Sequence, residues 1–555
     1  MANTKVTKAV LANDAVGLDQ LDISNDPSNG QALTYVATSN DLQWATISGG
    51  ASDINGLSDA KTFGTSSIMI GDTTTGTIDA ANYNTGVGVD VFAALTSGDD
   101  NCAYGVGAVK TLTSGSQNTG VGVLAGSSYS TSTFNTSLGY RAHGSGSTQT
   151  GSYNTAVGAY ALDVQTTGSS CVGVGYGAGS ALTTGGNNTF IGANSGENAT
   201  TTSNNTSCGN SALNALTTGT QNNAFGHASL GSCTTGNYNC AFGQASLNAL
   251  TTGTDNCAFG DNALQFGTTG SSNIGIGTNA LRNCTTGGNI SIGYASGLST
   301  TSGDASVTMG YEAGEDKTTG AHLTAIGYRA AMNATTGNYN TIMGSNSAPS
   351  MTTPNYNTLL GYNAGGGSYP LTTGSSCTMV GALARPSGTL GNANSENVFG
   401  FNMSASGAGT TTLGSGGSGL YATHGSSGWT SISDERYKKD IVDSEVGLSF
   451  INDLKVRNFK WKTCGEVPSN TPKYKEGSNE LIHETMTGVM HGFIAQEVKE
   501  VIDNHSEVPN NQLIWKQNPD GIQNLSKEEL VPVLVKAVQE LSAEVQQLKN
   551  KLQGE

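Results

Sequence analysis

Two residues with complementary chemistry stand five positions apart in the stretch SISDERYKKDI, residues 431–441. Ser433 supplies a hydroxyl, which is an effective nucleophile at neutral pH only when a base within hydrogen-bond reach takes its proton. Lys438 supplies an amine, which acts as a base only if burial or neighbouring cations lower its pKa from about 10.4. Arg436 and Lys439 flank Lys438 and push in that direction. The two residue types are those of a Ser-Lys dyad, although by themselves they fit a helix cap better.

The spacing of the dyad sets a condition on the local structure. Five residues of a regular helix rotate by about 500°, or roughly 140° net, so the two side chains cannot share a helical face. We expect Ser433 on an extended or turn segment ahead of a helix that starts near Asp434, or a lysine from a neighbouring chain. Ser433 is also a good helix N-cap ahead of acidic first-turn residues, and the two roles are compatible. Ser431 is a competing nucleophile, but seven residues separate it from Lys438.

The composition changes at this stretch. Residues 1–433 hold 9 Lys and Arg and 21 Asp and Glu, whereas residues 434–555 hold 15 and 20. The last fifth of the chain thus carries more than half of the charges, which predicts a separate domain of conventional composition. The net charge of -17 and the absence of a basic run argue against nucleic acid or an anionic membrane as a partner.

The sequence also lacks the signals of exported proteins, of membrane proteins and of metal sites. The first residues, MANTKVTKAVLANDAVG, show no apolar core of signal-peptide length, and no window approaches the roughly 18 apolar residues of a membrane helix. We therefore expect a protein that is made in the cytoplasm and is not inserted in a membrane. The nine cysteines form no CxxC pair or Cys/His cluster, so the sequence predicts free thiols, no metal site and no cofactor. Cys240 and Cys257 fall in register as stacked small apolar residues, or as a disulfide ladder.

The long glycine-rich part is a repeat. An N-x-x-x-G core recurs as NTGVG at 84, NTAVG at 154, NCAFG at 239 and 256, and NTLLG at 357, mostly in steps of 17 residues. A fixed period over about twenty copies signals a stacked-repeat architecture. Each unit has short alternating strands and tight turns, so residues 65–415 are predicted to form a mainly β fold, a β-solenoid shaft. We expect the apolar fourth position of the core to face inward and each Asn and Thr to lie above its equivalent.

This shaft resembles the β-roll heads of trimeric autotransporter adhesins and the shafts of viral tail fibres, which implies three parallel chains in one rod. Residues 1–64 lie outside the period and suggest small β modules. They are similar to N-terminal segments of tail-fibre proteins of marine phages, which implies attachment to other tail proteins of a virion. Residues 416–432 are expected to be a linker.

A heptad pattern occupies the C-terminal end. Apolar residues alternate steps of four and three at the a and d positions, which predicts a coiled-coil helix that pairs with copies of itself. We call these residues the heptad seam: Leu534, Val538, Leu541, Val545, Leu548 and Leu552. The heptads alone do not decide between two strands and three.

Residues 433–555 resemble the intramolecular chaperone auto-processing domain of phage tail spikes, including endosialidases. SDERYKKDI fits its S-D-x-R-x-K pattern, LKVRNFKWK its next strand and GFIAQEV its central motif. The resemblance implies a small α+β domain that assembles a homotrimer, guides folding of the shaft and then cuts itself off as a serine peptidase acting once. It implies Ser433 as nucleophile, Lys438 as its partner and Ser433-Asp434 as the scissile bond. Further candidates for support are Arg436, His491, Gln496 and Glu497.

Together these features predict a structural tail fibre or spike of a virion that attaches to a host receptor, such as a glycan. Exposed tyrosines could contact it, or could simply stack along the rod: Tyr140, Tyr160, Tyr176, Tyr311 and Tyr328. One alternative is a polysaccharide-degrading spike, which needs paired carboxylates about 5 to 9 Å apart in a groove. The other is a bacterial adhesin, which the missing signal peptide disfavours.

Overall fold

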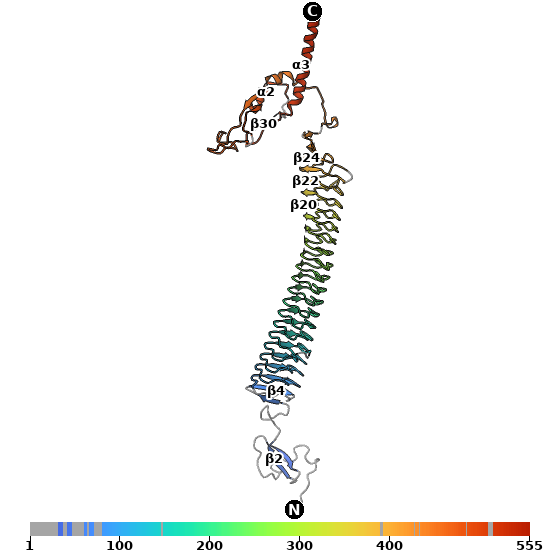
Figure 1. The fold of residues 1–555 in the computed structure, drawn as a ribbon, viewed down its shortest axis with the longest axis vertical. Coiled ribbons are helices and arrows are strands. Elements are labelled where there is room, and N and C mark those ends of the chain that lie inside the picture. The colour runs from blue at the N-terminus through green and yellow to red at the C-terminus, as the bar shows by residue number, and fades with distance from the viewer. Residues whose placement is uncertain are drawn as a thin grey trace, which may run out of the picture. The chain divides into compact units, whose positions relative to one another are not determined.

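The structure is a computed structural model of the chain of 555 residues. The described residues are 31–36, 41–46, 60–63, 66–71, 80–145, 148–388, 392–426, 428–431, 433–483, 486–508 and 514–554. The chain divides into two compact units, Met1–Ile432 and Ser433–Glu555. Strands dominate the first unit and helices occur in the second (Figure 1). Most of the predicted N-terminal segment, 1–64, lies outside the described residues, apart from the antiparallel hairpin of β1 (Gln31–Val36) and β2 (Asp41–Thr46) and strand β3 (Ala60–Phe63).

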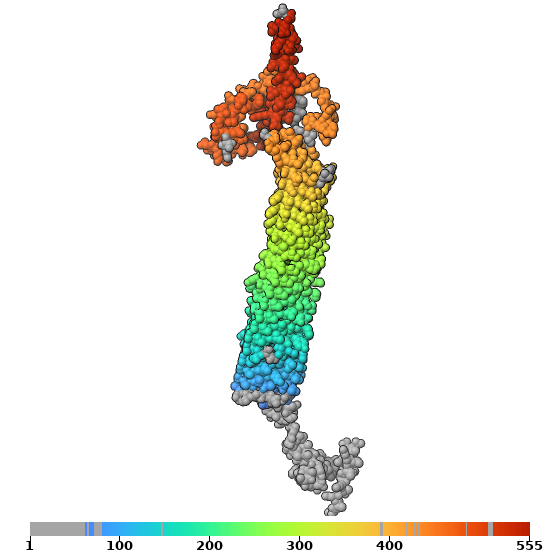
Figure 2. Space-filling model, turned by 45° about the vertical axis from the view of Figure 1, so that its right-hand side comes forward, coloured from blue at the N-terminus to red at the C-terminus, as the bar shows by residue number. Residues whose placement is uncertain are grey.

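The first unit is a β-solenoid in which each coil adds one short strand to a parallel ladder. Figure 2 shows these coils stacked into a continuous rod. After β3, which pairs antiparallel with β4, the strands are β4 (Ser67–Gly71), β5 (Thr85–Gly88), β6 (Cys102–Tyr104), β7 (Thr119–Val121), β8 (Thr136–Leu138), β9 (Thr155–Val157), β10 (Val172–Val174), β11 (Thr189–Ile191), β12 (Thr206–Cys208), β13 (Asn223–Phe225), β14 (Cys240–Phe242), β15 (Cys257–Phe259), β16 (Ile274–Ile276), β17 (Ile290–Ile292), β18 (Val307–Met309), β19 (Thr324–Ile326), β20 (Thr341–Met343), β21 (Thr358–Leu360), β22 (Thr378–Val380), β23 (Asn397–Phe399) and β24 (Thr410–Ser415).

The predicted period is confirmed by the strand register. Thr155 pairs with Val172 and Val172 with Thr189, each 17 residues on, and about twenty coils stack in this way. Longer coils occur where the sequence spacing lengthens, as between Thr136 and Thr155. The ladder closes with antiparallel strands β25 (Ser418–Thr423) and β26 (Thr430–Ser431), which lie within the expected linker.

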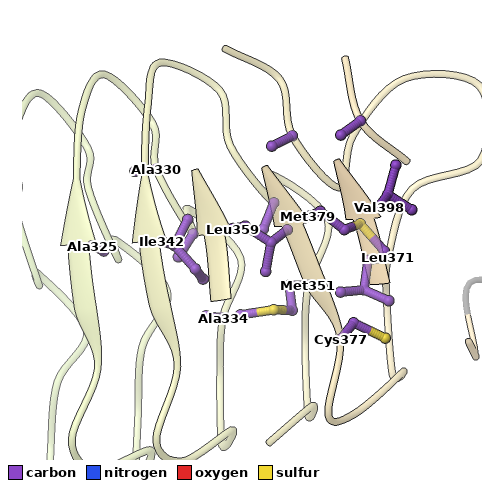
Figure 3. Close-up of a cluster of buried hydrophobic side chains, with 14 of the residues drawn as sticks. Ala325, Ala330, Ala334, Ile342, Met351, Leu359, Leu371, Cys377, Met379 and Val398 are labelled. Carbon is purple, nitrogen blue, oxygen red and sulfur yellow. The ribbon is translucent and has the colours of Figure 1, made fainter. Parts of the chain in front are cut away.

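The inward-facing position differs from the prediction. The third residue of each core is buried, as Ala156 is, whereas the fourth, Val157, is only half-buried. Figure 3 shows such buried third-position residues, among them Ile342, Leu359 and Met379, drawn as sticks. The prediction of an inward fourth position is therefore wrong. In a three-residue strand, faces alternate with period two, and the asparagine that opens the core also lies inside, which fixes the parity.

The asparagines form a buried ladder along the shaft. Asn239 Nδ2 donates to the carbonyl of Gly253 at 2.9 Å and to Oδ1 of Asn222 at 3.1 Å. Its Oδ1 accepts the amide of Asn256 at 3.1 Å. Each amide side chain thus satisfies a turn carbonyl of its own coil and a backbone amide of the next, which offsets the cost of burial. Stacking of each asparagine on its equivalent is confirmed.

Threonines and glycines complete the coil. Thr217 Oγ1 donates to the carbonyl of Thr234 at 3.0 Å, and the same bond repeats along the TTG turns. Gly226 has φ 129° and a Cβ there would lie 2.5 Å from the carbonyl oxygen of Gly243. Only glycine permits both this conformation and this approach, which explains the invariant end of the repeat core.

The cysteines are free thiols, as predicted. Cys240 pairs with Cys257 in register on β14 and β15. Cys233 and Cys284 are buried at equivalent turn positions. Stacked small residues, rather than a disulfide ladder, therefore describe this part of the shaft.

The second unit is small and mixed α+β. Its elements are η3 (Glu435–Tyr437), α1 (Leu448–Asp453), β27 (Arg457–Phe459), β28 (Met490–Gly492), α2 (Ala495–Asn504), β29 (Trp515–Gln517), β30 (Gln523–Leu525) and α3 (Leu530–Gln553). Phe450 of α1 is fully buried and belongs to one apolar cluster with Val498 of α2 and Val533 of α3. Glu540 of α3 accepts the amide of Leu448 at 2.7 Å, which ties the helix to the N-terminus of α1.

Candidate functional site: a serine-lysine pair at the start of the second unit

The structure brings Ser433 and Lys438 together. Lys438 Nζ lies 2.7 Å from Ser433 Oγ and donates a hydrogen bond to it. Between them, η3 is a single turn of 3₁₀ helix, Glu435–Tyr437, and Lys438 that follows it is extended, with φ -116° and ψ 148°. This short turn folds the chain back so that both side chains reach the same side, which a regular helix over the five residues would prevent.

The residue that caps the turn is Asp434. Its backbone is extended, and its carboxylate accepts the amide of Arg436 at 2.9 Å. The N-cap role considered for Ser433 therefore falls to its neighbour, and the Ser433 hydroxyl is left to Lys438. Acidic residues are favoured at this position because they accept free first-turn amides.

Arg436 is paired with the same carboxylate. Its Nη2 lies 2.6 Å from Asp434 Oδ2, and this guanidinium lowers the pKa of the Asp434 carboxyl. In the sequence Arg436 is a cation that flanks Lys438, whereas in the structure its guanidinium is paired with Asp434. The S-D-x-R spacing held the signal for this pair, since it places acid and base two residues apart.

The other predicted support residues lie on the β27–β28 pair and on α2. His491 Nδ1 lies 2.9 Å from Asn458 Oδ1, and Glu497 forms an ion pair with Arg457 at 2.8 Å. The arginine lowers the pKa of the Glu497 carboxyl. Gln496 is exposed on α2. Within the described residues, the bonds of His491 and Glu497 go to β27 and not to the dyad, and Asn458 and Arg457 are partners that the sequence did not indicate.

Both members of the dyad are open to solvent. Ser433 and Lys438 are exposed. A lysine that serves as a base needs a site shielded from water or crowded by other cations. Among the described residues of this single chain, nothing shields the pair from water. The two side chains thus have the hydrogen-bonded geometry of a dyad in a solvent-exposed site.

The heptad seam is exposed along α3. Val538 is 61% exposed and Leu548 is 58% exposed, while Leu530, Val533 and Ala537, on the adjacent face of the first turns of the helix, are buried in the unit. An apolar a/d row in water is a surface that pairs with another helix. The helix therefore packs its first turns against its own domain and leaves the heptad seam exposed.

Several predicted tyrosines stack along the shaft. Tyr294, Tyr311 and Tyr328 have ring centroids 5.1 and 5.5 Å apart in nearly parallel planes. Tyr140, Tyr160 and Tyr176 form edge-to-face contacts. Beside this second set is a shallow open groove lined by two tyrosines and two carboxylates, Tyr160, Tyr176, Asp163 and Glu197.

Asp163 is the more enclosed of the two groove carboxylates. It is 9% exposed and forms an ion pair with Arg141 at 3.1 Å. Burial raises the pKa of its carboxyl, while Arg141 acts in the opposite direction. Glu197 accepts a hydrogen bond from Asn214 at 2.8 Å. The sequence did not indicate this groove, because residues from separate coils form it.

Two other classes of site are absent from the described residues. No helix among them has both the length and the apolar character to cross a membrane. In the same part of the chain, no group of three or more His, Cys, Asp or Glu side chains is arranged to hold a metal ion.

Comparison with known proteins gives one match. Residues 433–507 match a peptidase family model described as "Chaperone of endosialidase". No curated protein and no solved structure matched the chain. The match begins at Ser433, the first residue of the second unit, and covers the dyad, His491, Gln496 and Glu497. At its C-terminal end the chain is thus similar to the chaperone of endosialidase, and a β-solenoid followed by such a segment fits a tail-fibre or endosialidase-type protein.

Proposed function

We propose that the protein is a structural tail fibre or spike of a virion, made in the host cytoplasm and assembled as a homotrimer. Its C-terminal domain directs trimerisation and shaft folding and then releases itself by autoproteolysis at Ser433-Asp434. The observation that carries the proposal is the 2.7 Å contact between Lys438 Nζ and Ser433 Oγ at the first residue of the second unit. The exposed heptad seam supports an assembly of several chains.

The proposed reaction hydrolyses one peptide bond. The bond from the Ser433 carbonyl carbon to the Asp434 nitrogen breaks, and water supplies a hydroxyl to the new carboxyl and a proton to the new amine. Attack by Ser433 Oγ on the carbonyl of its own residue would close a strained four-membered lactone. A Ser433 hydroxyl from a neighbouring copy avoids that ring, with Lys438 as the base that takes its proton. Contact with a neighbouring copy would also supply the enclosure that a single chain lacks.

Cleavage would then report assembly. The dyad geometry exists in one chain, but a second copy would complete the site. An unassembled shaft would keep its chaperone domain, and an assembled one would lose it. The irreversible cut would then take place only after folding has succeeded.

The test is a denaturing gel of purified protein. The unmodified chain should give fragments of about 433 and 122 residues, as the bond position requires. Ser433→Ala and Lys438→Ala should each leave the full chain of 555 residues. Ser431→Ala is the matched control and should cut normally. Equal cutting in Ser433→Ala and the unmodified protein would rule out the dyad.

For host attachment, we propose contact with a surface glycan at the groove of Tyr160, Tyr176, Asp163 and Glu197. Tyrosine rings offer apolar faces to sugar C–H groups, and carboxylates accept sugar hydroxyls. The N-terminal segment would join other tail proteins. The groove also favours a second candidate, a polysaccharide-degrading spike, since it contains two carboxylates. Release of reducing sugar from host polysaccharide, lost in Glu197→Gln, would favour the second candidate, whereas binding without release would favour the first.

A further inference from the structure

The parallel sheet of the shaft has an outward side without charge. Its two outward columns hold the residues aligned with Thr155 and with Val157 on strands β4–β24, and we call these columns the outer sheet face. Thr, Cys, Val, Ile and Asn fill the first column. The second column is apolar throughout, apart from the hydroxyl of Tyr104: Ile70, Val87, Tyr104, Val121, Leu138, Val157, Val174, Ile191, Cys208, Phe225, Phe242, Phe259, Ile276, Ile292, Met309, Ile326, Met343, Leu360, Val380, Phe399 and Leu413.

These side chains are only partly covered by the rest of the chain. Phe259 is 55% exposed and Leu360 is 47% exposed. The rings of Phe225, Phe242 and Phe259 stack on one another at 4.7 and 5.2 Å, which joins successive coils into one apolar surface. Monomeric soluble proteins rarely expose contiguous apolar patches above a few hundred Å².

A second exposed column of the same shaft has a different composition. The residue just before each core asparagine points outward too, and there tyrosines such as Tyr238, 59% exposed, alternate with Asp100, Asp255 and Gln117. Solvent exposure alone therefore does not select apolar residues along this rod. The outer sheet face excludes charge over all of its strands, as the core of an interface does.

We propose that the outer sheet face is the surface through which copies of this chain pack against one another, parallel and in register. This proposal rests on the proposed homotrimer and states which side of the shaft faces the common axis. The groove of Tyr160 and Glu197 and the charged turn residues would then remain on the outside.

The repeat itself argues for a second copy as the occupant. Strands about 4.8 Å apart make the outer sheet face on the order of 100 Å long. Its side chains recur once per 17-residue coil. A covering molecule must match that spacing along the whole length, and another copy of the chain does so without any further design. In a parallel arrangement the heptad seams of the copies would lie at the same end of the assembly, where they could pair.

The size of the outer sheet face suits a stable contact. If each large side chain loses roughly 50 Å² of exposed area, the face buries on the order of 1,000 Å² per chain, and stable interfaces need about 800 Å² per partner. Because the contacts are spread evenly along the rod, single changes should weaken the assembly locally, and a charge at the centre should act most strongly.

The first test substitutes two exposed aromatic residues in neighbouring coils. Phe259→Asp places a carboxylate on the outer sheet face, and Tyr238→Asp places one on the mixed column. We expect Phe259→Asp to raise the monomer fraction at least tenfold in light scattering of the full chain, and Tyr238→Asp to leave assembly unchanged. Equal trimer formation in both variants would overturn the assignment of this face.

The second test does not depend on a destabilised variant. Cys208 is exposed and belongs to the outer sheet face. In a variant with Cys102→Ser, Cys240→Ser and Cys257→Ser, a short bismaleimide should link Cys208 between chains and give a covalent dimer band. Moving the thiol from the outer sheet face to the mixed column, with Cys208→Ser and Tyr238→Cys, should abolish the band. A band only in this control variant would place the mixed column at the contact instead.

The two tests separate this inference from the proposed function. If the unmodified protein is monomeric, both the proposed homotrimer and the proposed role of the outer sheet face are wrong. If the unmodified protein is a trimer, but Phe259→Asp assembles normally and Cys208 gives no link, only the role of the outer sheet face is wrong. Circular dichroism of Phe259→Asp distinguishes loss of assembly from loss of the coil fold.

Discussion

The shaft and the C-terminal unit satisfy their side chains in opposite ways. In the shaft, Asn239 finds all of its partners within its own coil and its neighbours. In the C-terminal unit, Lys438 and the heptad seam face solvent. The difference teaches that the buried polar groups of each coil are satisfied within the shaft, whereas the apolar heptad seam of the second unit stays exposed in a single chain.

Local completeness has a disadvantage for register. Coils of nearly identical sequence fit against any other coil, so three shafts could align with a shift of one or more coils at little cost in contacts. α3 carries its heptads once, at a fixed place in the chain. We infer that the C-terminal unit supplies the register that the repeats lack.

The largest expected effect comes from removing that unit. A chain that ends at Ile432 should give at least tenfold less soluble, heat-resistant trimer than the full chain, because its coils no longer start in register. The measurement is the yield after heating and size-exclusion chromatography with light scattering. Full-length Lys438→Ala is the control, since it keeps the unit and blocks only the cut. Equal yield from the shortened chain would show that the shaft aligns itself.

A smaller effect is expected from breaking one rung of the asparagine ladder. Asn239→Ala leaves the Gly253 carbonyl and the Asn256 amide without partners, which should cost about 3 kcal/mol of unfolding free energy. Asn239→Cys should cost less, because Cys171 occupies the same slot naturally and its Sγ lies 3.4 Å from the Gly185 carbonyl. Denaturant unfolding of the shaft measures both. Equal costs for Ala and Cys would mean that the polar contacts contribute little.

The smallest effect is a difference in pH response between the two units. His143 in the shaft is fully buried, with Nδ1 2.9 Å from Ser137 Oγ and Nε2 2.9 Å from Gln165 Oε1. Burial lowers the pKa of His143 to about 4, so the unfolded chain binds this proton first as the pH falls. Shaft stability should therefore drop between pH 6.5 and 4, by about 2 kcal/mol at pH 5.

His505 in the C-terminal unit should respond with the opposite sign. Glu507 and Asp453 raise the pKa of its imidazole, so its contribution is present at acid pH and is lost as the pH rises above its folded-state pKa. Thermal melts at several pH values, with His143→Gln and His505→Gln, resolve the two contributions. Parallel shifts of both transitions with pH would contradict the assignment.

Much of the fold was predictable from the sequence because the repeat is explicit. A 17-residue step between glycines such as Gly226 and Gly243 admits few architectures besides stacked coils, and these glycines meet in the structure. The charge discontinuity likewise marked residue 433 as the start of a different composition. In the candidate site, the residue types of Ser433 and Lys438 indicated a serine nucleophile with a lysine base.

The orientation of the strands was decided only by the tertiary structure. Both Ala156 and Val157 are apolar, so alternation with period two did not show which one faces inward. The buried asparagine settles the parity, because its amide must reach the turn carbonyl and the next coil. The 2.7 Å contact of Ser433 with Lys438 likewise depends on one 3₁₀ turn capped by Asp434. The sequence thus determined the repeat and the reacting groups, while backbone hydrogen bonding decided which side of each strand is core and which is surface.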